Sequence, residues 1–356
     1  MRIVITGASG NIGTAVLRRL TTAATPHDIV GVCRRPPGDD EPYDAVEWGC
    51  IDLADPSAGG RLAPVLSGAD AVVHLAWGFQ PSHDTDYLDR VGIDGTRSVL
   101  TAADAAGVPH LVHMSSLGAY SPGPADPVSA AWPTAGIGSS AYSRQKVAAE
   151  RLLDEYERAH PGGMAIARLR PALVIQRAAG SALLRYGVPG YVPAALLRHV
   201  PVLPVDRSLA LQVVHTDDVA DAVVRVLEQK ATGAFNLAAD PPIIRDDIAE
   251  ALGARAVHLP RPVLRAATAV SWQARLQPVD PGWIDLAFAV PLMDTSHARA
   301  ELGWQPSVDS RAALAELVGG MADAAAEPSP ALRPRSMPEE FARLIRRGPL
   351  TKRRLP

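Results

Sequence analysis

The stretch "RIVITGASGNIG", Arg2 to Gly13, decides the fold of this 356-residue chain. Its first residues, 2–6, are rich in β-branched side chains and predict a strand, whereas residues 11–23 follow a helical pattern. Three glycines spaced three positions apart stand between them. Glycines in such a turn let the backbone approach a pyrophosphate, and the helix start presents free N–H groups to it. A dinucleotide should therefore contact this loop and the first helical turn: Gly7, Ser9, Gly10, Asn11, Ile12 and Gly13.

The alternation of strand and helix continues through the first half of the chain. Longer helical patterns, among them residues 86–106 and a helix beginning near Tyr142, separate short apolar runs. Alternation of this kind is typical of parallel sheets, whose crossovers are right-handed. We therefore expect an α/β fold with a Rossmann-type, doubly wound parallel sheet. The further strands are expected at residues 27–33, 44–50, 70–76, 109–116 and 163–174.

The second half predicts a smaller, mainly helical lobe. Residues 1–175 should form the dinucleotide-binding domain, which residues 206–240 rejoin through a strand at 233–238. Residues 176–205 and 241–326 should form a substrate-binding lobe. Its helical patterns cover residues 244–253, 262–276, 294–302 and 309–325.

Residues 327–356 differ in composition from the rest and form a basic Pro/Arg-rich tail. It carries eight Arg or Lys residues against three Glu residues. We expect a solvated, partly disordered end. Contact with an acidic partner or an anionic substrate is the alternative.

The overall composition is that of a soluble globular protein. Hydrophobic residues make up 47% and charged residues 21%, and the net charge is −3, so neither nucleic acid nor an anionic membrane is an expected partner. No apolar run approaches the ~18 residues of a membrane span. The start is too briefly apolar for a signal peptide, and two cysteines give no disulfide framework. We therefore expect a cytoplasmic location, and the histidines match no metal-site spacing.

Tyr142 and Lys146 stand one helical turn apart in "AYSRQKVAAE", Ala141 to Glu150. The chain has only three lysines against 32 arginines, and this is its only Tyr-x-x-x-Lys. Residues four apart share a helix face. A nearby ammonium favours tyrosinate and should lower the pKa of Tyr142 from its usual value near ~10, into a range suited to acid–base work.

The glycine spacing and the Tyr-x-x-x-Lys motif resemble the extended branch of the short-chain dehydrogenase/reductase family, the NAD-dependent epimerase/dehydratase-like proteins. Further matches are "HMSSLGAY", "RLRPALV", "VVHTDDVADAV" and "ELGWQP", so that the resemblance covers roughly residues 1–320. It implies a catalytic Ser116, Tyr142 and Lys146, with Lys146 also binding the nicotinamide ribose. It also implies cofactor contacts from Asp52, Leu53, Leu75, Ala76, Trp77, Pro171 and Val174.

The residues after the second expected strand bear on the cofactor. NAD-binding proteins place a carboxylate there to hold the ribose hydroxyls, but this chain has Arg34 and Arg35. Guanidinium groups bind phosphate well. The sequence therefore favours NADP(H), with NAD(H) as the alternative.

Two departures from the family pattern affect the interpretation. The usual Asn-Val-x-Gly-Thr reads "GIDGT" here, with Gly92 in place of asparagine, and the family's Gly-Pro after the Arg-Pro strand appears as Ile175-Gln176. The arginine that often precedes the His-x-Asp-Asp segment in nucleotide-sugar enzymes is missing.

The leading hypothesis is an NADP(H)-dependent oxidoreductase that interconverts a carbonyl and an alcohol on a small-molecule substrate. One alternative is a nucleotide-sugar epimerase or dehydratase with tightly bound NAD. A second is a dinucleotide-sensing protein without turnover. The helix carrying Tyr142 permits a homodimer, because the family often dimerises through it.

Overall fold

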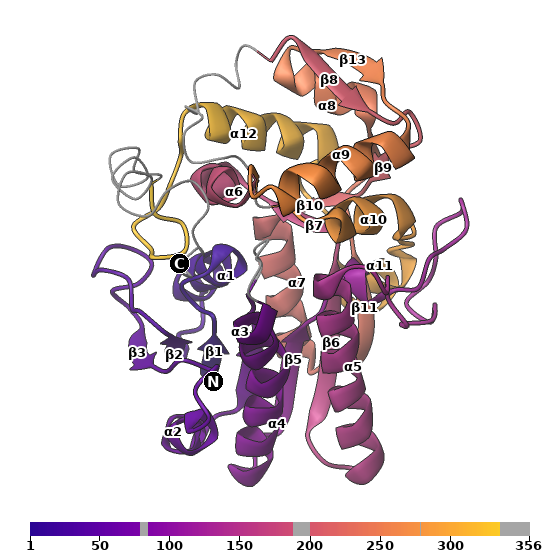
Figure 1. Cartoon of the computed structure of the whole chain (residues 1–356). Helices are drawn as coiled ribbons and strands as arrows, with labels where there is room; N and C mark the ends of the chain where they lie inside the picture. Colours follow the sequence, from indigo (N-terminus) through magenta and orange to yellow (C-terminus); the bar gives the residue numbers. More distant parts are fainter. Residues whose placement is uncertain (79–84, 188–199, 278, 335–356) are drawn as a thin grey trace.

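A seven-stranded sheet whose neighbouring strands all run parallel forms the centre of the molecule (Figure 1). The structure is a computed structural model and describes residues 1–78, 85–187, 200–277 and 279–334. The strand order is β11-β6-β5-β4-β1-β2-β3. The strands are β1 (Arg2–Thr6), β2 (Asp28–Cys33), β3 (Glu47–Cys50), β4 (Ala71–His74), β5 (His110–Met114), β6 (Ala165–Pro171) and β11 (Gly233–Leu237).

The order of the strands reverses beside β1, which lies between β2 and β4. Ligands of open α/β sheets bind at the carboxyl ends of the strands where the order reverses. The glycine loop follows β1 directly, so it lies at this crevice. The predicted α/β fold and doubly wound sheet are confirmed, and residues 233–237 join the sheet beside β6 as expected.

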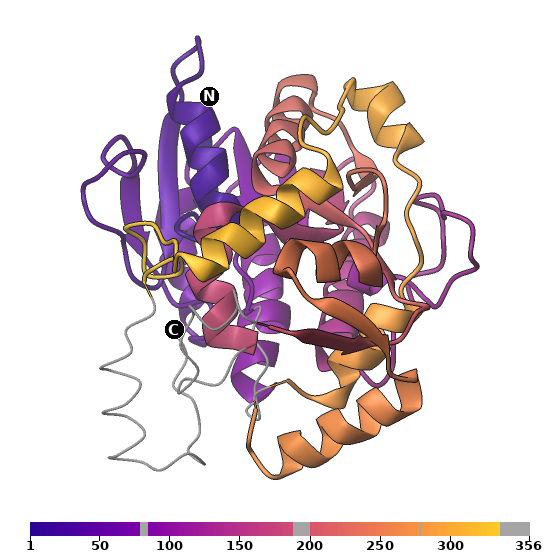
Figure 2. The same ribbon diagram turned by 90° about the horizontal axis from the view of Figure 1, so that it is seen from above.

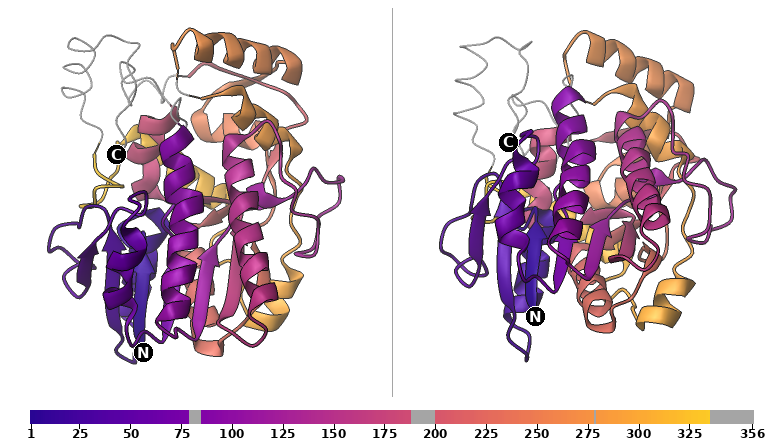
Figure 3. Two further views of the ribbon diagram at one scale, coloured as in Figure 1. Left: turned by 60° about the horizontal axis from the view of Figure 1, so that its bottom comes forward. Right: turned by 90° about the horizontal axis from the view of Figure 1, so that it is seen from below.

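Helices cover both faces of the sheet. Alternate residues of β1 face opposite sides: Ile3 and Ile5 belong to a core with α1 (Asn11–Thr21) and α7 (Thr216–Gln229), whereas Val4 belongs to the other core. On that second face α4 and α5 run side by side (Figure 3). The helices of this face are α2 (Ala58–Leu66), α4 (Gly95–Ala105) and α5 (Ala141–Ala159).

The single helix expected at residues 86–106 is divided into three parts. A short helix, α3 (Thr85–Asp89), leads into a π-helical segment, Arg90–Asp94, before α4 begins. Gly92 is buried in the π-helical segment. The wider turn is one that often marks functional sites.

The remaining elements lie above the carboxyl edge of the sheet, where α12 crosses the molecule and α9 lies at its margin (Figure 2). The expected helices are present as α8 (Arg245–Leu252), α9 (Arg261–Gln273), α11 (Ser296–Leu302) and α12 (Ser310–Ala322). The sequence did not reveal α6 (Gly180–Gly187), α10 (Pro281–Ala289) or three strand pairs. These pairs are β7 (Leu173–Ile175) with β10 (Val213–His215), β8 (Val202–Val205) with β13 (Arg255–His258), and β9 (Ala210–Leu211) with β12 (Ile243–Ile244). The division into domains stays a prediction.

Residues 327–334 pack against the protein rather than forming a solvated end. Leu332 is buried, and Glu327 forms an ion pair with Arg18 of α1. The expectation of a solvated tail is therefore wrong for these residues, because an apolar side chain and an ion pair hold them. Residues 335–356 of the predicted tail lie outside the described residues.

Trp304 links the segment that follows α11 to α7. Its side chain is fully buried, and its indole N–H donates to the Asp218 carbonyl over 2.8 Å. The Asp218 carboxylate accepts from the Ser307 N–H (2.8 Å) and hydroxyl (2.6 Å). Two segments 86 residues apart are thus joined at one point.

We expect Trp304→Ala to lower the free energy of unfolding by about 3–5 kcal/mol, because a large buried side chain leaves a cavity. Urea unfolding followed by circular dichroism measures the loss. Val270→Ala on α9 is the control, because Val270 is 67% exposed and should change stability by less than about 0.5 kcal/mol. Equal effects of the two substitutions would contradict the assignment of Trp304 to the core.

Candidate active site

Tyr142, Lys146 and Glu150 lie along one face of α5. The helix begins after Ser140, whose hydroxyl accepts from the Ser143 N–H over 3.3 Å. A serine in this position satisfies a backbone N–H that the helix itself cannot pair. The cap therefore sets where the helix starts, and residues at intervals of four then face the same side.

The structure brings Ser116 and Tyr142 together. Ser116 follows β5, and its hydroxyl accepts from the Gly118 N–H over 3.0 Å at the start of a short 3₁₀ turn, Leu117–Ala119. The side chain of Tyr142 is hydrogen-bonded to Ser116. Gly118 leaves room for this contact, because a Cβ there would lie 3.0 Å from the Tyr142 ring. Two hydroxyls thus meet at the carboxyl edge of the sheet.

Tyr142 faces a small pocket between α5 and the C-terminal part of the chain. Its ring stacks on Trp283 of α10, with centroids 5.4 Å apart and planes 27° from parallel. Burial raises the pKa of Tyr142 to about 12, against the opposing hydrogen bond from Ser116. The pocket is lined by Gly78, Thr85, Leu88, Ala141, Tyr142, Gln145, Asp280 and Trp283.

Lys146 is buried and directed away from the Tyr142 ring. Its ammonium donates to the Met114 carbonyl over 2.8 Å and lies 3.4 Å from the centre of the Trp77 ring, but 6.0 Å from that of Tyr142. Burial lowers the pKa of Lys146 well below its usual value, although the charge of Glu150 opposes this shift. The expected lowering of the Tyr142 pKa is therefore wrong for this arrangement, because burial outweighs any effect of the ammonium.

Trp77 explains the absence of the family's asparagine at position 92. A Cβ on Gly92 would lie 3.1 Å from the Trp77 indole, so a larger residue would crowd the ring. The indole face in turn contacts the Lys146 ammonium, and such cation–π contacts are strongest when desolvated. The missing side chain at Gly92 thus leaves the space that the Trp77 ring occupies. The sequence hinted at this pairing only through the unusual "GIDGT".

Glu150 was missed by the sequence interpretation, although it stands one turn after Lys146. Its carboxylate accepts from the Ser115 hydroxyl (2.5 Å) and from two nitrogens of Arg170 on β6 (2.8 and 2.9 Å). Burial alone would raise the pKa of Glu150, but the hydrogen bonds and charge of Arg170 lower it. The pair therefore fastens α5 to β5 and β6 next to the proposed catalytic residues.

The predicted cofactor residues gather at the carboxyl edge. The loop after β1 has Gly7 at φ +74°, and a Cβ there would lie 2.6 Å from the Ala76 nitrogen. No side chain caps α1, so its first N–H groups can bind a phosphate. This tight, uncapped turn fits a dinucleotide. Leu75 and Ala76, which follow β4, lie against the loop at Gly7. The other predicted residues follow neighbouring strands at the same edge of the sheet: Trp77 after β4, Arg34 and Arg35 after β2, and Asp52 and Leu53 after β3.

The two predicted phosphate-binding arginines differ in their surroundings. Arg34 donates to the Tyr87 hydroxyl over 2.8 Å, and that hydroxyl lies 3.3 Å from the Asp52 carboxylate. Arg35 is exposed. Leu53 is buried against α4. Of the four residues, Arg35 is thus the one most open to a ligand.

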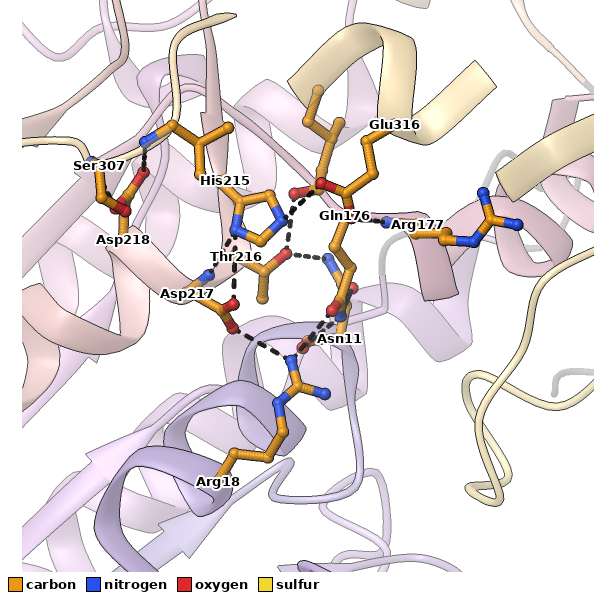
Figure 4. Close-up of polar contacts among 12 residues, drawn as sticks. Asn11, Arg18, Gln176, Arg177, His215, Thr216, Asp217, Asp218, Ser307 and Glu316 are labelled. Carbon is orange, nitrogen blue, oxygen red and sulfur yellow. Dashed lines mark hydrogen bonds and ion pairs between the residues drawn. The ribbon is translucent and has the colours of Figure 1, made fainter. Parts of the chain in front are cut away.

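A polar cluster joins α1 to β7 and α7 behind the glycine loop (Figure 4). Gln176 donates to the Asn11 side-chain oxygen over 2.7 Å, and Asn11 donates to the Val174 carbonyl over 3.4 Å. Arg18 bridges Gln176 and Asp217, each over 3.1 Å. The bond from the Asn11 side chain to the Val174 carbonyl therefore links the start of α1, next to the glycine loop, to β7. Pro171 ends β6, where it pairs with Leu237.

The comparisons with known proteins agree with this geometry. Residues 3–238 match the NAD dependent epimerase/dehydratase family. The chain belongs to this family. The resemblance inferred from the motifs, to the extended short-chain dehydrogenases/reductases, is thus confirmed.

Individual members of the epimerase/dehydratase family show how far the likeness extends. An uncharacterised protein of Mycobacterium tuberculosis is 29% identical over 88% of this chain, which spans only 29% of that protein's length. UDP-glucose 4-epimerase of Mycolicibacterium smegmatis is 29% identical over 89% of this chain and 97% of its own. The structure of Thermus thermophilus UDP-glucose 4-epimerase with NAD has a TM-score of 0.67 at 19% identity, covering 90% of this chain and 99% of that one, which is a likeness of fold.

Among the described residues, no group of three His, Cys, Asp or Glu residues could hold a metal ion. In the same part of the chain, none of the helices is both long and apolar enough to cross a membrane.

We expect Gly92→Asn to destabilise the protein by about 1–3 kcal/mol, because the new side chain must displace the Trp77 indole. Trp77→Ala in the same chain should remove most of that cost. A double-mutant cycle in urea measures the coupling. Gly60→Asn on α2 is the matched control, since a Cβ there meets nothing within 4 Å. Independent effects of the changes at positions 92 and 77 would contradict the pairing.

We expect Trp283→Ala to lower the pKa of Tyr142 from about 12 toward the ~10 of a free tyrosine, because water then reaches the hydroxyl. The tyrosinate absorbance of each protein is titrated and compared with that of the same protein carrying Tyr142→Phe. A raised folded-state pKa contributes stability fully below pH ~10 and loses it toward pH 12. The variant should therefore lose less stability over that range, and an unchanged pKa would show that Trp283 does not shield Tyr142.

Proposed function

We propose that this chain is an NADP(H)-dependent oxidoreductase that interconverts a carbonyl and an alcohol. The observation that carries the proposal is the hydrogen bond between Ser116 and Tyr142 at the carboxyl edge, with Lys146 one turn further along α5. Family membership supports an NAD-dependent enzyme of the extended short-chain type. The specific reaction is our inference from the site.

Each of the three residues has a distinct role in this proposal. When bound, a nicotinamide cofactor would supply the hydride for reduction or accept it in oxidation. Ser116 donates a hydrogen bond to the substrate oxygen, and Tyr142 gives that oxygen a proton during reduction or takes it back during oxidation. With a pKa near 12, Tyr142 holds its proton at neutral pH, which suits the donor in the reductive direction. Lys146 turns from Trp77 to bind the nicotinamide ribose.

The proposed preference for NADP(H) depends on the residues that follow β2. No carboxylate stands there to bind the ribose hydroxyls, and Arg35 is exposed just after β2. A guanidinium attracts a phosphate, whereas a carboxylate would repel it. NAD(H) is the alternative, because Arg34 already binds Tyr87.

A nucleotide-sugar epimerase with tightly bound NAD is the second candidate. The likeness to a curated UDP-glucose 4-epimerase over almost its whole length favours it. Against it, the pocket beside Tyr142 includes the acidic Asp280 and the aromatic Trp283, and the segment before β10 lacks the expected arginine. A carboxylate in the pocket disfavours a second anionic ligand there. We therefore place a small carbonyl compound or alcohol ahead of a sugar nucleotide.

We further propose a cytoplasmic protein that forms a homodimer through α4 and α5. Their shared face carries a groove between the helices, in which the Tyr156 hydroxyl donates to Asp104 over 2.6 Å. Two adjacent helices on one face could pair with the same two helices of a second copy about a two-fold axis. Analytical ultracentrifugation tests the assembly directly.

The purified protein should be free of dinucleotide and should bind NADPH better than NADH. Denaturation followed by mass spectrometry identifies any released cofactor, and fluorescence titration gives both affinities. Carbonyl compounds are then screened with NADPH, and Tyr142→Phe should lower turnover by about 10²–10⁴-fold while leaving NADPH affinity unchanged. Stoichiometric NAD released on denaturation would overturn this proposal in favour of the epimerase. Cofactor binding without turnover of any carbonyl or sugar nucleotide would instead indicate a sensor.

A further inference from the structure

The C-terminal strap, which we define as residues Glu327 to Pro334, crosses the glycine loop. The Ser329 hydroxyl donates to the Ser9 carbonyl over 2.8 Å, and the Glu327 carboxylate accepts from Arg18 over 2.7 Å. Ser9 is one of the predicted cofactor residues, and Arg18 lies on the helix that follows the loop. The strap is therefore fastened to the phosphate-binding end of the sheet.

The strap also packs against α6 and is hydrogen-bonded to it. Leu332 is 1% exposed and packs with Ala179, which precedes α6, and with Ala182 in the first turn of α6. Arg185 of α6 donates to the Ala331 carbonyl over 2.5 Å and also to the Arg333 carbonyl. In Figures 1 and 2 the yellow strap accordingly lies next to α6 and the N-terminal strands. Its backbone is thus held at Ala331 and at Arg333 itself.

Arg333 stands four residues after Ser329, which is bonded to the Ser9 carbonyl of the glycine loop, and its charge acts on Arg35 after β2. Partial burial, together with the charges of Arg34 and Arg333, lowers the pKa of Arg35. Three guanidinium groups from two distant segments therefore gather beside the loop. Like charges repel, so such a cluster is costly unless an anion neutralises it.

Within the described residues, the carboxylate near this cluster is that of Asp52, which accepts from the Tyr87 hydroxyl beside Arg34. Arg34 is bound to the Tyr87 hydroxyl, whereas neither Arg35 nor Arg333 has a side-chain hydrogen bond or ion pair within the described part of the chain. Neighbouring arginines that do carry ion pairs, such as Arg18 with Glu327 and Arg177 with Asp323, show that acidic partners are available in this region. Arg35 and Arg333 are therefore available to bind an anionic ligand.

We propose that Arg333, carried by the strap, joins Arg35 to form a binding site for the 2′-phosphate of NADP(H). A guanidinium presents a planar fork of N–H donors that fits phosphate oxygens, and two such groups can share one dianionic phosphate. The adenosine ribose of a dinucleotide lies at the end of β2 in folds of this kind. The strap thus contributes a residue from the C-terminal part of the chain to the proposed cofactor site.

The inference rests on the proposed preference for NADP(H) and deepens it. The sequence interpretation assigned that preference to Arg34 and Arg35 alone. In the structure Arg34 is engaged by Tyr87, and Arg333 takes its place as the second phosphate ligand. The strap also bonds to α6, so cofactor binding and the position of α6 become linked.

The test compares Arg333→Gln with the unaltered full chain by calorimetric titration. The probes are 2′,5′-ADP, which carries the 2′-phosphate, and 5′-ADP, which lacks it. Loss of charge-assisted hydrogen bonds should weaken binding of 2′,5′-ADP and NADPH about 10- to 100-fold, while the affinities for 5′-ADP and NADH stay the same. Arg35→Gln should behave similarly, and the double variant should lose less than the sum of the two single effects.

Arg255→Gln on β13 is the matched control, because this exposed arginine lies in the C-terminal part and should leave all four affinities unchanged. Ser329→Ala removes the bond to the Ser9 carbonyl without touching a charge. It should produce part of the loss seen with Arg333→Gln. Circular dichroism confirms that each variant is folded before titration.

The outcomes separate this inference from the proposed function. Selective NADPH binding by the unaltered chain, with Arg333→Gln causing no change or weakening NADH equally, would overturn the strap site and leave the oxidoreductase proposal intact. A chain that binds 5′-ADP as well as 2′,5′-ADP would overturn both the strap site and the NADP(H) preference. Turnover of a carbonyl with NADH would still support the oxidoreductase in that case.

Discussion

The buried pair of Glu150 and Arg170 is the interaction on which the site depends. Glu150 is 1% exposed, and its carboxylate accepts from Ser115 after β5 and from Arg170 and Arg168 of β6. A buried carboxylate that loses its partner costs about 3–5 kcal/mol. Helix α5 can therefore dock only in the register in which Glu150 meets β6. That register places Lys146 one turn and Tyr142 two turns closer to the cofactor edge.

The same network extends beyond the helix. Arg170 also donates to the Ala130 carbonyl over 2.8 Å and to the Tyr120 hydroxyl over 3.1 Å, and Tyr120 donates to Asn236 of β11. The loop of residues 121–140 is therefore joined to β6 and β11 at one end of the sheet. The network around one ion pair thus connects two strands, this loop and α5, and α5 carries Tyr142 at the pocket.

Close backbone approach at the glycine loop supplies a second constraint. Gly7 lies so near the segment after β4 that even a Cβ would clash with Ala76, and the next residue is Trp77. The position of the Trp77 ring over Lys146 follows from this contact and from the space that Gly92 leaves. The departure of "GIDGT" from the family pattern is thus compensated within the site. An aromatic ring is therefore the neighbour of the Lys146 ammonium.

The sequence by itself determined the α/β fold, the strands of the sheet and the three residues proposed for catalysis. These features depend on local patterns: β-branched runs, a glycine turn between a strand and a helix, and a Tyr-x-x-x-Lys spacing that puts two side chains on one helical face. Only the tertiary structure decided the surroundings of those residues. Trp283, Glu150 and Arg333 reach the site across about 141, 20 and 298 positions of the chain from Tyr142, Arg170 and Arg35 respectively, and no local pattern encodes such pairings. Burial, which raises the pKa of Tyr142 and lowers that of Lys146, likewise depends on what packs over them, because desolvation is a property of the folded molecule rather than of the sequence.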